Sequence, residues 1–348
     1  MLTSELNYNL PPELIAQHPV VPRDLSRLLV YDRLTDSMKH RRLLDLLAHL
    51  NPGDALVYND SRVLRARVRA LKPTGGKVEL LFLQRRRVKL WEALVKPSAR
   101  LQEGTGLELA PEFTARIDGL KTGAVFTLKE NLGGGRWLVK NMTATATEEL
   151  LEQIGEMPLP PYIKERLDEP ERYQTVYASE RGSAAAPTAG LHFTRELIER
   201  IRAAGVALLP LTLHIGLDTF RPVNEAVLEL HEIHSEHYRL PADSYEEIRR
   251  TKDRGGRVVA VGTTAVRTLE TVFQEPYGPL EGETSLFITP GYRFRVVDAL
   301  LTNFHLPRST LLALVMAFAG GQQTRRLYRE AVRQEYRFFS FGDAMLLL

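Results

Sequence analysis

The sequence predicts an α/β protein, with a large mixed-sheet α/β domain and a small antiparallel β-barrel domain inserted into it. Apolar strands alternate with helices in the first and last parts of the chain, as in α/β domains. Between them, short strands follow one another with turn signals, which favours a barrel or sandwich. The chain of 348 residues is long enough for two domains. We therefore expect residues 1–60 and 153–348 to form the α/β domain and residues 61–152 the barrel.

The first part of the α/β domain is predicted from two apolar runs and two helical patterns. Proline opens the first helical pattern, and the sequence Asn51-Pro52-Gly53 ends the second. In chain order, the expected elements are a short helix at 10–16, a strand at 27–31, a helix at 42–50 and a strand at 55–58.

The inserted segment consists of short stretches of alternating character. Glycine-containing turns at 73–76 and 133–135 separate some of them. The predicted strands are 64–71, 77–83, 88–95, 106–110, 114–117, 124–128 and 136–139.

The last part of the chain repeats a strand, a loop and a helix. Ligands gather beyond the carboxyl ends of such strands in open α/β sheets. The expected elements are strand 258–261, turn 262–264, helix 265–273, strand 298–302, loop 303–308 and helix 309–319, with Gly320 and Gly321 as the stop.

Residues 182–194 (GSAAAPTAGLHFT) form a loop with little side chain to bury. Glycine lets the backbone approach a ligand closely, and Pro187 fixes the course of the loop. Thr194 is expected to cap the helix that follows. The loop is either a ligand-binding turn with His192 on its rim or a tight structural turn.

Three loops present a histidine beside small or hydroxyl residues, namely His192, His214 and His305. A single such histidine is more often a hydrogen-bonded structural residue. Three in matching contexts favour a shared pocket in which imidazoles move protons near neutral pH. The pattern does not say which histidine is base and which is acid.

Two helix starts have both a binding and a structural interpretation. Gly262, Thr263 and Thr264 would place helix amides and two hydroxyls around a carboxylate or phosphate, or Thr264 is simply a cap. Ser309 is expected to be a cap. The sequence contains neither a Gly-x-Gly-x-x-Gly motif nor a Walker loop, so the ordinary dinucleotide and nucleoside triphosphate signatures are missing.

His231, His234 and His237 do not follow the His-Glu-x-x-His pattern. On one helix their spacing would spread the rings around the cylinder, so no metal site is predicted. Glu236, in the same segment, could pair with a cationic ligand or with a nearby arginine.

Basic residues gather in the inserted segment. Arg65, Arg67 and Arg69 alternate with small apolar residues, which on a strand puts three guanidinium groups on one face. The interpretation is either an RNA phosphate footprint or a solvated barrel face. A second basic cluster consists of Arg85, Arg86, Arg87 and Lys89.

The composition excludes several functions. With 44% hydrophobic and 26% charged residues and a net charge of +3, the chain is expected to be soluble and globular, and RNA binding must rest on a local patch. The sequence has no cysteine, which excludes disulfides, a thiol nucleophile and cysteine-bound zinc or iron–sulfur clusters. No signal peptide or membrane span is visible, and a cytoplasmic location is expected.

Short motifs spread over nearly the whole chain carry a family resemblance. They are 14–17 (LIAQ), 23–30 (RDLSRLLV), 58–63 (YNDSRV), 155–163 (GEMPLPPYI), 172–177 (RYQTVY), 182–193, 260–264 (AVGTT), 302–307 (TNFHLP) and 336–345 (YRFFSFGDAM). In this order they resemble the S-adenosylmethionine:tRNA ribosyltransferase-isomerase family of queuosine biosynthesis. Two positions depart from the family pattern: Asp218 stands where a glycine is usual, and Ile233 where methionine is common.

The resemblance implies a two-domain enzyme acting on tRNA. It would pass the ribosyl part of S-adenosylmethionine to a 7-aminomethyl-7-deazaguanine base at the anticodon wobble position. The sugar would rearrange to an epoxycyclopentane, giving epoxyqueuosine-tRNA, while adenine and methionine leave. S-adenosylmethionine is then a co-substrate, no metal or membrane is involved, and a monomer is expected.

This chemistry asks for more than one proton-handling group, because a C5′ proton beside the sulfonium is removed and the departing adenine is protonated. We expect His192, His214 and His305 to share these tasks. Contacts to the co-substrate are expected from Thr188, Gly190, Gly216, Gly262, Thr263, Thr264 and Asn303. Contacts to RNA are expected from Arg62, Arg65, Arg67 and Arg69.

Two other functions are weighed against this one. A non-catalytic RNA-binding protein would explain the basic strand but would need no closed, ligand-sized cavity. A methyltransferase using the same co-substrate would release S-adenosylhomocysteine, but the glycine-rich first loop usual in that class is missing.

Overall fold

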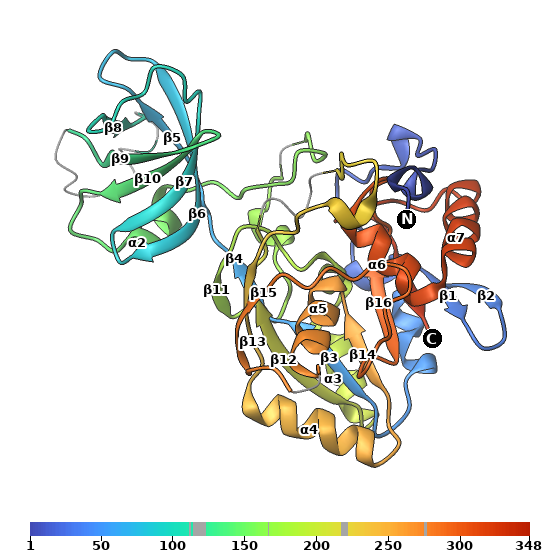
Figure 1. Ribbon diagram of the computed structural model, residues 1–348. Helices are drawn as coiled ribbons and strands as arrows, with labels where there is room; N and C mark the ends of the chain where they lie inside the picture. The colour runs from blue at the N-terminus through green and yellow to red at the C-terminus, as the bar shows by residue number, and fades with distance from the viewer. Residues whose placement is uncertain (111–112, 114–122, 166, 217–221, 275–276) are drawn as a thin grey trace. The chain divides into compact units, whose positions relative to one another are not determined.

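The structure, a computed structural model, describes residues 1–348 apart from 111–112, 114–122, 166, 217–221 and 275–276 (Figure 1). The described chain divides into two compact units. The α/β unit comprises Met1–Arg62, Pro160–Glu180 and Ala186–Leu348, and the barrel unit comprises Val63–Leu159 and Arg181–Ala185. The predicted fold class, a mixed-sheet α/β domain with an inserted antiparallel barrel, is confirmed.

The α/β unit is built on a mixed sheet whose described strands run in the order β15-β13-β12-β3-β14-β16-β17-β1-β2. The central strands β12, β3, β14 and β16 are parallel, so their carboxyl ends lie at one edge of the sheet. β17 is antiparallel to β16 and parallel to β1. The strands are β1 (Arg27–Asp32), β2 (Ser37–Arg42), β3 (Ala55–Asn59), β12 (Ala207–Leu213), β13 (Glu236–Arg239), β14 (Val258–Val261), β15 (Glu281–Thr284), β16 (Ala299–Asn303) and β17 (Ala344–Leu347).

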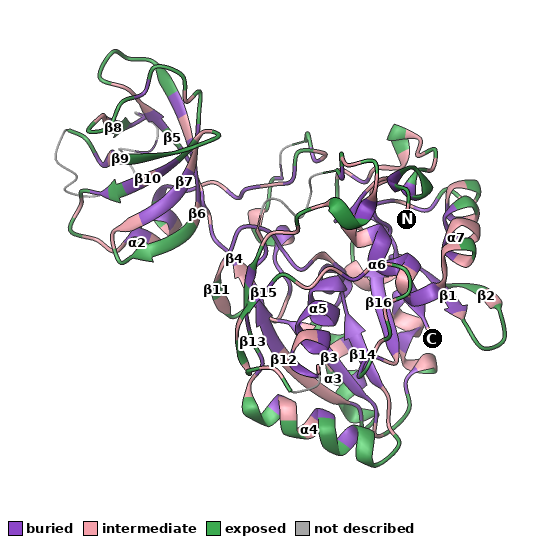
Figure 2. Ribbon diagram, viewed as in Figure 1, coloured by how far each residue is buried: buried purple, intermediate pink, exposed green. Residues whose placement is uncertain are grey.

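Helices cover the sheet and bury its apolar strands. α5 packs on the four parallel strands, and every residue of it except Thr271 is buried, as Figure 2 shows. α4 is buried on one side only and keeps a solvent-exposed face. The α-helices of this unit are α3 (Arg195–Ala203), α4 (Ala242–Asp253), α5 (Thr263–Val272), α6 (Thr310–Ala319) and α7 (Gly321–Arg333).

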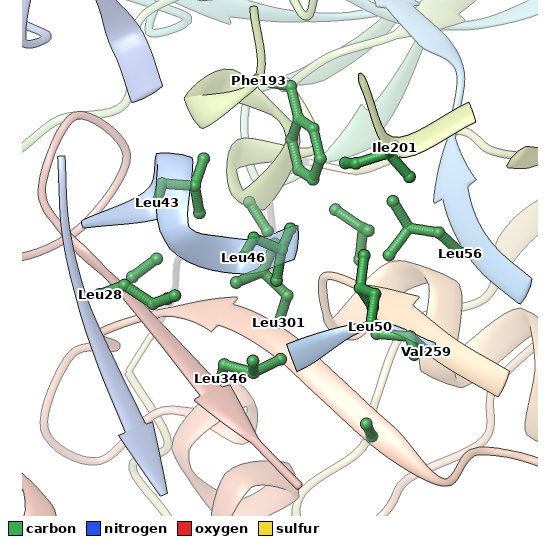
Figure 3. Packing of buried hydrophobic residues seen from close by; sticks show 14 of the residues in the cluster. Leu28, Leu43, Leu46, Leu50, Leu56, Phe193, Ile201, Val259, Leu301 and Leu346 are labelled. Carbon is green, nitrogen blue, oxygen red and sulfur yellow. The ribbon is translucent and has the colours of Figure 1, made fainter. Parts of the chain in front are cut away.

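One apolar cluster joins the sheet to α3 and to the segment 182–194. Leu56, Val259 and Leu301 come from three neighbouring strands, and Ile201 from α3 (Figure 3). Phe193, 1% exposed, points into the same cluster. Burying a side chain of this size is worth roughly 1.5–3 kcal/mol. Phe193 therefore anchors the small-residue loop to the core of the sheet.

The barrel unit contains a closed antiparallel barrel with strand order β10-β7-β6-β5-β8-β9. Alternate residues of each strand fill its interior, among them Phe82, Phe126 and Trp137. Its elements are β5 (Arg67–Leu71), β6 (Lys77–Arg87), β7 (Leu90–Lys96), β8 (Gly106–Leu109), β9 (Phe126–Gly133), β10 (Arg136–Asn141) and α2 (Thr147–Ile154). The short strands β4 (Ser61–Val63) and β11 (Glu180–Ser183) pair with each other.

Both predicted helix caps are confirmed. The side-chain oxygen of Thr194 accepts from the N–H of Leu197, and that of Ser309 accepts from the N–H of Leu312, each at 3.1 Å. These caps fix where α3 and α6 begin, because each satisfies an amide that has no partner inside its helix.

Several predicted elements differ in detail. The helices expected at 10–16 and 42–50 are 3-10 segments, and over so few residues an apolar pattern cannot separate a period of 3.0 from 3.6. The strand expected from 64 begins at Arg67, because the chain turns where Ala66 N–H donates to the Leu64 carbonyl at 2.7 Å. The sequence did not predict α2.

The remaining short helices are also 3-10 segments. They are η1 (Thr3–Leu6), η2 (Pro12–Leu14), η3 (Arg23–Leu25), η4 (Leu43–His49), η5 (Pro170–Tyr173), η6 (Thr188–His192) and η8 (Leu228–Leu230). The strand expected at 114–117 and the unusual Asp218 lie outside the described residues. Within the described ranges, no helix has both the length and the apolar character to cross a membrane.

Candidate active site

Two small cavities lie at the carboxyl ends of β14 and β16, each with a volume of about 30 Å³. The cavities adjoin, because Thr188, Asn303, His305 and Leu311 line both, and we call the pair the cleft. The aromatic cavity is otherwise lined by Tyr162, Pro222, Phe304, Leu306, Ser309, Phe339 and Ser340. The α5 cavity is otherwise lined by Ala186, Pro187, Ala189, Ile215, Gly262, Thr263, Thr264 and Thr302.

His305 is the histidine of the cleft and lines both cavities. Its Nε2 lies 2.9 Å from Thr302 Oγ1. Its backbone N–H donates to the hydroxyl of Tyr328, and its carbonyl accepts from the hydroxyl of Tyr8. Burial lowers the pKa of His305 to about 3. The ring is therefore neutral at pH 7, which is the form that can accept a proton.

Asn303, the last residue of β16, connects the cleft to His192. Its Nδ2 donates to the carbonyl of Phe339 at 3.1 Å and lies 2.9 Å from His192 Nε2, while its Oδ1 accepts from Thr188 Oγ1 at 2.9 Å. A carbonyl can only accept, so this bond fixes which end of the amide faces His192. Nε2 of His192 is then an acceptor, and the ring proton is on Nδ1.

His192 itself lies beside the cleft rather than in it. It is buried and lines a separate small cavity that Arg23 and Ser340 also line. Burial, helped by the charges of Arg337 and Arg23, lowers the pKa of His192 to about 3. Its Nε2 is already engaged by the side-chain amide of Asn303.

His214 lines neither cavity of the cleft. It follows β12 and stacks on His237 of β13, with ring centroids 6.0 Å apart and planes 18° apart. Its buried Nδ1 has no hydrogen-bond partner among the residues that the structure describes. Burial, together with the neighbouring His237, lowers the pKa of His214. Of the three predicted histidines, the cleft therefore contains His305, and Asn303 links it to His192.

α5 begins at the cleft, where Gly262, Thr263 and Thr264 line the α5 cavity. Gly262 is its N-cap with a φ of 87°, so Thr264 is not the cap. A Cβ at Gly262 would lie 3.3 Å from the Cβ of Ala189. In the described part of the chain no side chain caps this helix, and Thr264 Oγ1 is buried without a hydrogen-bond partner. The amides of the first turn also lack partners within the helix.

Gly190 and Gly216, both expected to contact the co-substrate, line neither cavity. A Cβ at Gly190 would lie 2.0 Å from the hydroxyl oxygen of Tyr177, so close packing explains this glycine. The N–H of Gly216 donates to Glu236 Oε1 at 2.9 Å. Their chain neighbours Ala189 and Ile215 line the α5 cavity instead.

Glu236 pairs with an arginine, one of its two predicted alternatives. Glu236 and Arg267 form an ion pair whose side chains are 2% and 7% exposed. Burial alone would raise the pKa of Glu236, but the hydrogen bond with His234 and the charge of Arg267 bring it below its ordinary value. Among the described residues, no group of three or more histidine, aspartate or glutamate side chains is arranged to hold a metal ion.

The predicted arginine face exists on β5 but is partly neutralised. Arg67 and Arg69 point outward while Val68 and Ala70 are buried. Arg62 belongs to the α/β unit rather than to the barrel. The ion pairs are Arg62–Glu171 (2.9 Å), Arg65–Glu152 (4.0 Å), Arg67–Glu79 (3.9 Å) and Arg69–Glu156 (3.0 Å).

Sequence reasoning missed the aromatic wall of the cleft. The rings of Tyr162 and Phe339 lie 4.8 Å apart, and the hydroxyls of Tyr162 and Ser340 lie 2.7 Å apart. These residues belong to two of the family motifs, which was the available signal. Nothing in the local pattern said that the two motifs meet.

Comparisons with known proteins agree with this architecture. A family model described as "Queuosine biosynthesis protein" matches residues 3–347. The S-adenosylmethionine:tRNA ribosyltransferase-isomerase of Symbiobacterium thermophilum is 52% identical over 351 residues, covering 100% of both chains. The crystal structure of S-adenosylmethionine tRNA ribosyltransferase from Thermotoga maritima, at 2.00 Å resolution, is similar with 38% identity and a TM-score of 0.56, covering 99% of this chain and 100% of that one. With a family model spanning almost every residue, this chain belongs to the queuosine biosynthesis protein family.

Proposed function

We propose that this chain is an S-adenosylmethionine:tRNA ribosyltransferase-isomerase. It transfers and isomerises the ribosyl part of S-adenosylmethionine onto a 7-aminomethyl-7-deazaguanine base at the tRNA wobble position. The products are epoxyqueuosine-tRNA, adenine and methionine. The names of the two relatives, which match end to end, support this function. The observation on this chain that carries it is a polar cleft at the carboxyl ends of β14 and β16 whose two cavities meet at His305.

His305 is the proton carrier of the reaction. The sulfonium acidifies the adjacent C5′ position, and the neutral imidazole takes that proton as the C5′–H bond breaks. When the bond between the sugar and adenine breaks, its electron pair goes to adenine, which then needs a proton. His305 can return the one it took, because it lines both cavities.

The neighbours of His305 bind and orient. Thr302 contacts the ring at Nε2 and sets its direction. Asn303 and Thr188 offer hydrogen-bonding groups to the ribosyl part of the substrate, and His192 is a positioning residue that holds the Asn303 amide. Gly262, Thr263 and Thr264 contact the co-substrate at the start of α5.

Replacing each histidine by glutamine and measuring adenine release with precursor-bearing tRNA tests these roles. His305→Gln should lower kcat by about 10²–10⁴, the usual contribution of a general acid or base. His192→Gln should raise KM more than it lowers kcat, because it loosens a binding amide. His214→Gln should have the smallest effect. Near-normal turnover of His305→Gln would refute the assignment.

The outward arginines of β5 bind the phosphate backbone of tRNA, and Arg62 and Arg65 contribute further contacts to it. This RNA contact is supported by the alternation of side chains along β5, which turns Arg67 and Arg69 to the outer side of the strand. The enzyme acts as a monomer in the cytoplasm, where its proposed tRNA substrate is found. Light scattering coupled to size-exclusion chromatography would test the monomer.

Product analysis separates the competing functions. A ribosyl transfer releases adenine and methionine, whereas a methyltransferase would release S-adenosylhomocysteine and leave methylated RNA. A non-catalytic RNA-binding protein would release neither and has no use for the cleft.

A further inference from the structure

The start of α5 is an unsatisfied hydrogen-bonding site inside a cavity. The helix has no side-chain cap in the described chain, so the amides of its first turn are free to bind a ligand. Thr264, only 9% exposed, lines the same cavity, and its Oγ1 has no hydrogen-bond partner among the described residues. A buried hydroxyl without a partner costs free energy. A ligand with an acceptor group would therefore be stabilised by hydrogen bonds from this hydroxyl and from the helix amides.

The charge of the α5 cavity favours an anion over a cation. Among the described residues that line it, none carries a formal charge at neutral pH, since His305, the titratable one, is neutral. The electrostatic feature that remains is the N-terminus of α5, which carries a partial positive charge. A carboxylate placed there would meet amides, a hydroxyl and the helix dipole together.

The other end of the cleft has the opposite character. Tyr162, Phe304 and Phe339 line the aromatic cavity, whereas the described residues of the α5 cavity include no tyrosine, phenylalanine or tryptophan. Flat aromatic ligands gain from stacking or edge contacts with such rings. An elongated ligand with a carboxylate at one end and an aromatic base at the other therefore matches the chemical character of the two cavities in one direction.

We propose that the N-terminus of α5, with the hydroxyl of Thr264, binds the methionyl carboxylate of S-adenosylmethionine, and that adenine occupies the aromatic cavity. This rests on the proposed function, and it fixes the direction in which the substrate lies. The ribosyl part then lies between the two cavities, beside Asn303 and His305, which line both. The carboxylate end is held by the helix, away from the bonds that break.

The test compares two ligands on four proteins by titration calorimetry with the full-length chain. The ligands are S-adenosylmethionine and its decarboxylated analogue, which keeps the sulfonium and adenosine but lacks the carboxylate. The proteins are the wild type, Thr264→Val, Thr264→Ser and Thr268→Val. Thr268 is a matched control, because its hydroxyl is also buried on α5 without a partner in the described chain but does not line the cleft.

The wild type should bind the decarboxylated analogue at least about tenfold more weakly than S-adenosylmethionine, the loss expected for one charge-assisted contact. Thr264→Val should weaken S-adenosylmethionine about tenfold and the analogue by less than about twofold. Thr264→Ser and Thr268→Val should stay within about twofold of the wild type for both ligands.

Two results would overturn the proposal: equal binding of both ligands by the wild type, or an equal loss for both in Thr264→Val. If Thr264→Val does not fold, the affinities of the wild type and of Thr264→Ser for the two ligands still test whether binding depends on the carboxylate. Adenine release with precursor-bearing tRNA is measured in parallel. If the enzyme turns over but binds both ligands equally, only the proposed carboxylate site is refuted. If binding depends on the carboxylate but no adenine is released, the proposed reaction is refuted and the carboxylate site stands.

Discussion

Replacing Gly190 by alanine tests whether this glycine serves packing or ligand binding. Gly190 lies in η6, and a Cβ there would come within 2.0 Å of the Tyr177 hydroxyl oxygen and 2.8 Å of Thr175 Cγ2. Tyr177 cannot easily swing away, because its ring lies against Tyr58 and Phe193 at centroid distances of 4.3 and 6.3 Å.

The expected cost follows from these contacts. Overpacking a well-filled site costs typically about 1–3 kcal/mol, and a clash with a held aromatic ring belongs at the upper end. Alanine recovers a few tenths of a kcal/mol through the unfolded chain. We expect a net loss of about 2–3 kcal/mol. For a unit of this size, the melting temperature should fall by roughly 5–10 °C.

Tyr177→Phe supplies the matched partner for a double-mutant cycle. The Tyr177 hydroxyl is buried and has no hydrogen-bond partner in the described chain, so its removal should be neutral or stabilise by up to about 1 kcal/mol. In the double variant the alanine would still meet Thr175 Cγ2, so only part of the cost is relieved. The two changes should couple by about 1–2 kcal/mol.

The wild type, the two single variants and the double variant are compared by chemical denaturation, which gives stability, and by titration with S-adenosylmethionine, which gives affinity. Affinity should stay near that of the wild type, because neither Gly190 nor Tyr177 lines the cleft. A cycle without coupling would refute the packing argument. A stable Gly190→Ala variant that had lost S-adenosylmethionine binding would instead restore Gly190 as a ligand contact.

Three further predictions concern charge. Glu236→Gln should cost about 3–5 kcal/mol in urea unfolding, because it leaves the buried guanidinium of Arg267 without its counter-charge; a loss below about 1 kcal/mol would contradict this. The folded-state pKa values of His192 and His305, near 3, lie below the unfolded value, so their contribution to stability is complete above pH 6.5 and is lost as pH falls toward 3. Between pH 6.5 and 3, His192→Gln should reduce the slope of unfolding free energy against pH by about 1.4 kcal/mol per pH unit. Urea unfolding at several pH values measures this slope, and a slope equal to that of the wild type would refute the prediction. Arg69→Ala should weaken tRNA binding and reduce the slope of log affinity against log salt by about one in filter binding, whereas an unchanged slope would remove this residue from the RNA contacts.

The sequence alone determined the features that depend only on residues close together in the chain. The caps Thr194 and Ser309 and the buried strand Val258–Val261 follow from residue types a few positions apart. The alternation that turns Arg67 and Arg69 outward is likewise a property of one strand. The family resemblance also came from the sequence, because its motifs are contiguous.

The tertiary structure decided which of these pieces meet. Tyr162 and Phe339 form one wall of the cleft although they are far apart in the chain, and His214 stacks on His237 outside the cleft instead of joining His305. The reason for Gly190 is a tyrosine hydroxyl contributed by another segment. Periodicity and capping act over a few residues, whereas such contacts depend on strand order and on the paths of the connections. A list of strands and helices does not contain that information, so the composition of the site became visible only in the folded chain.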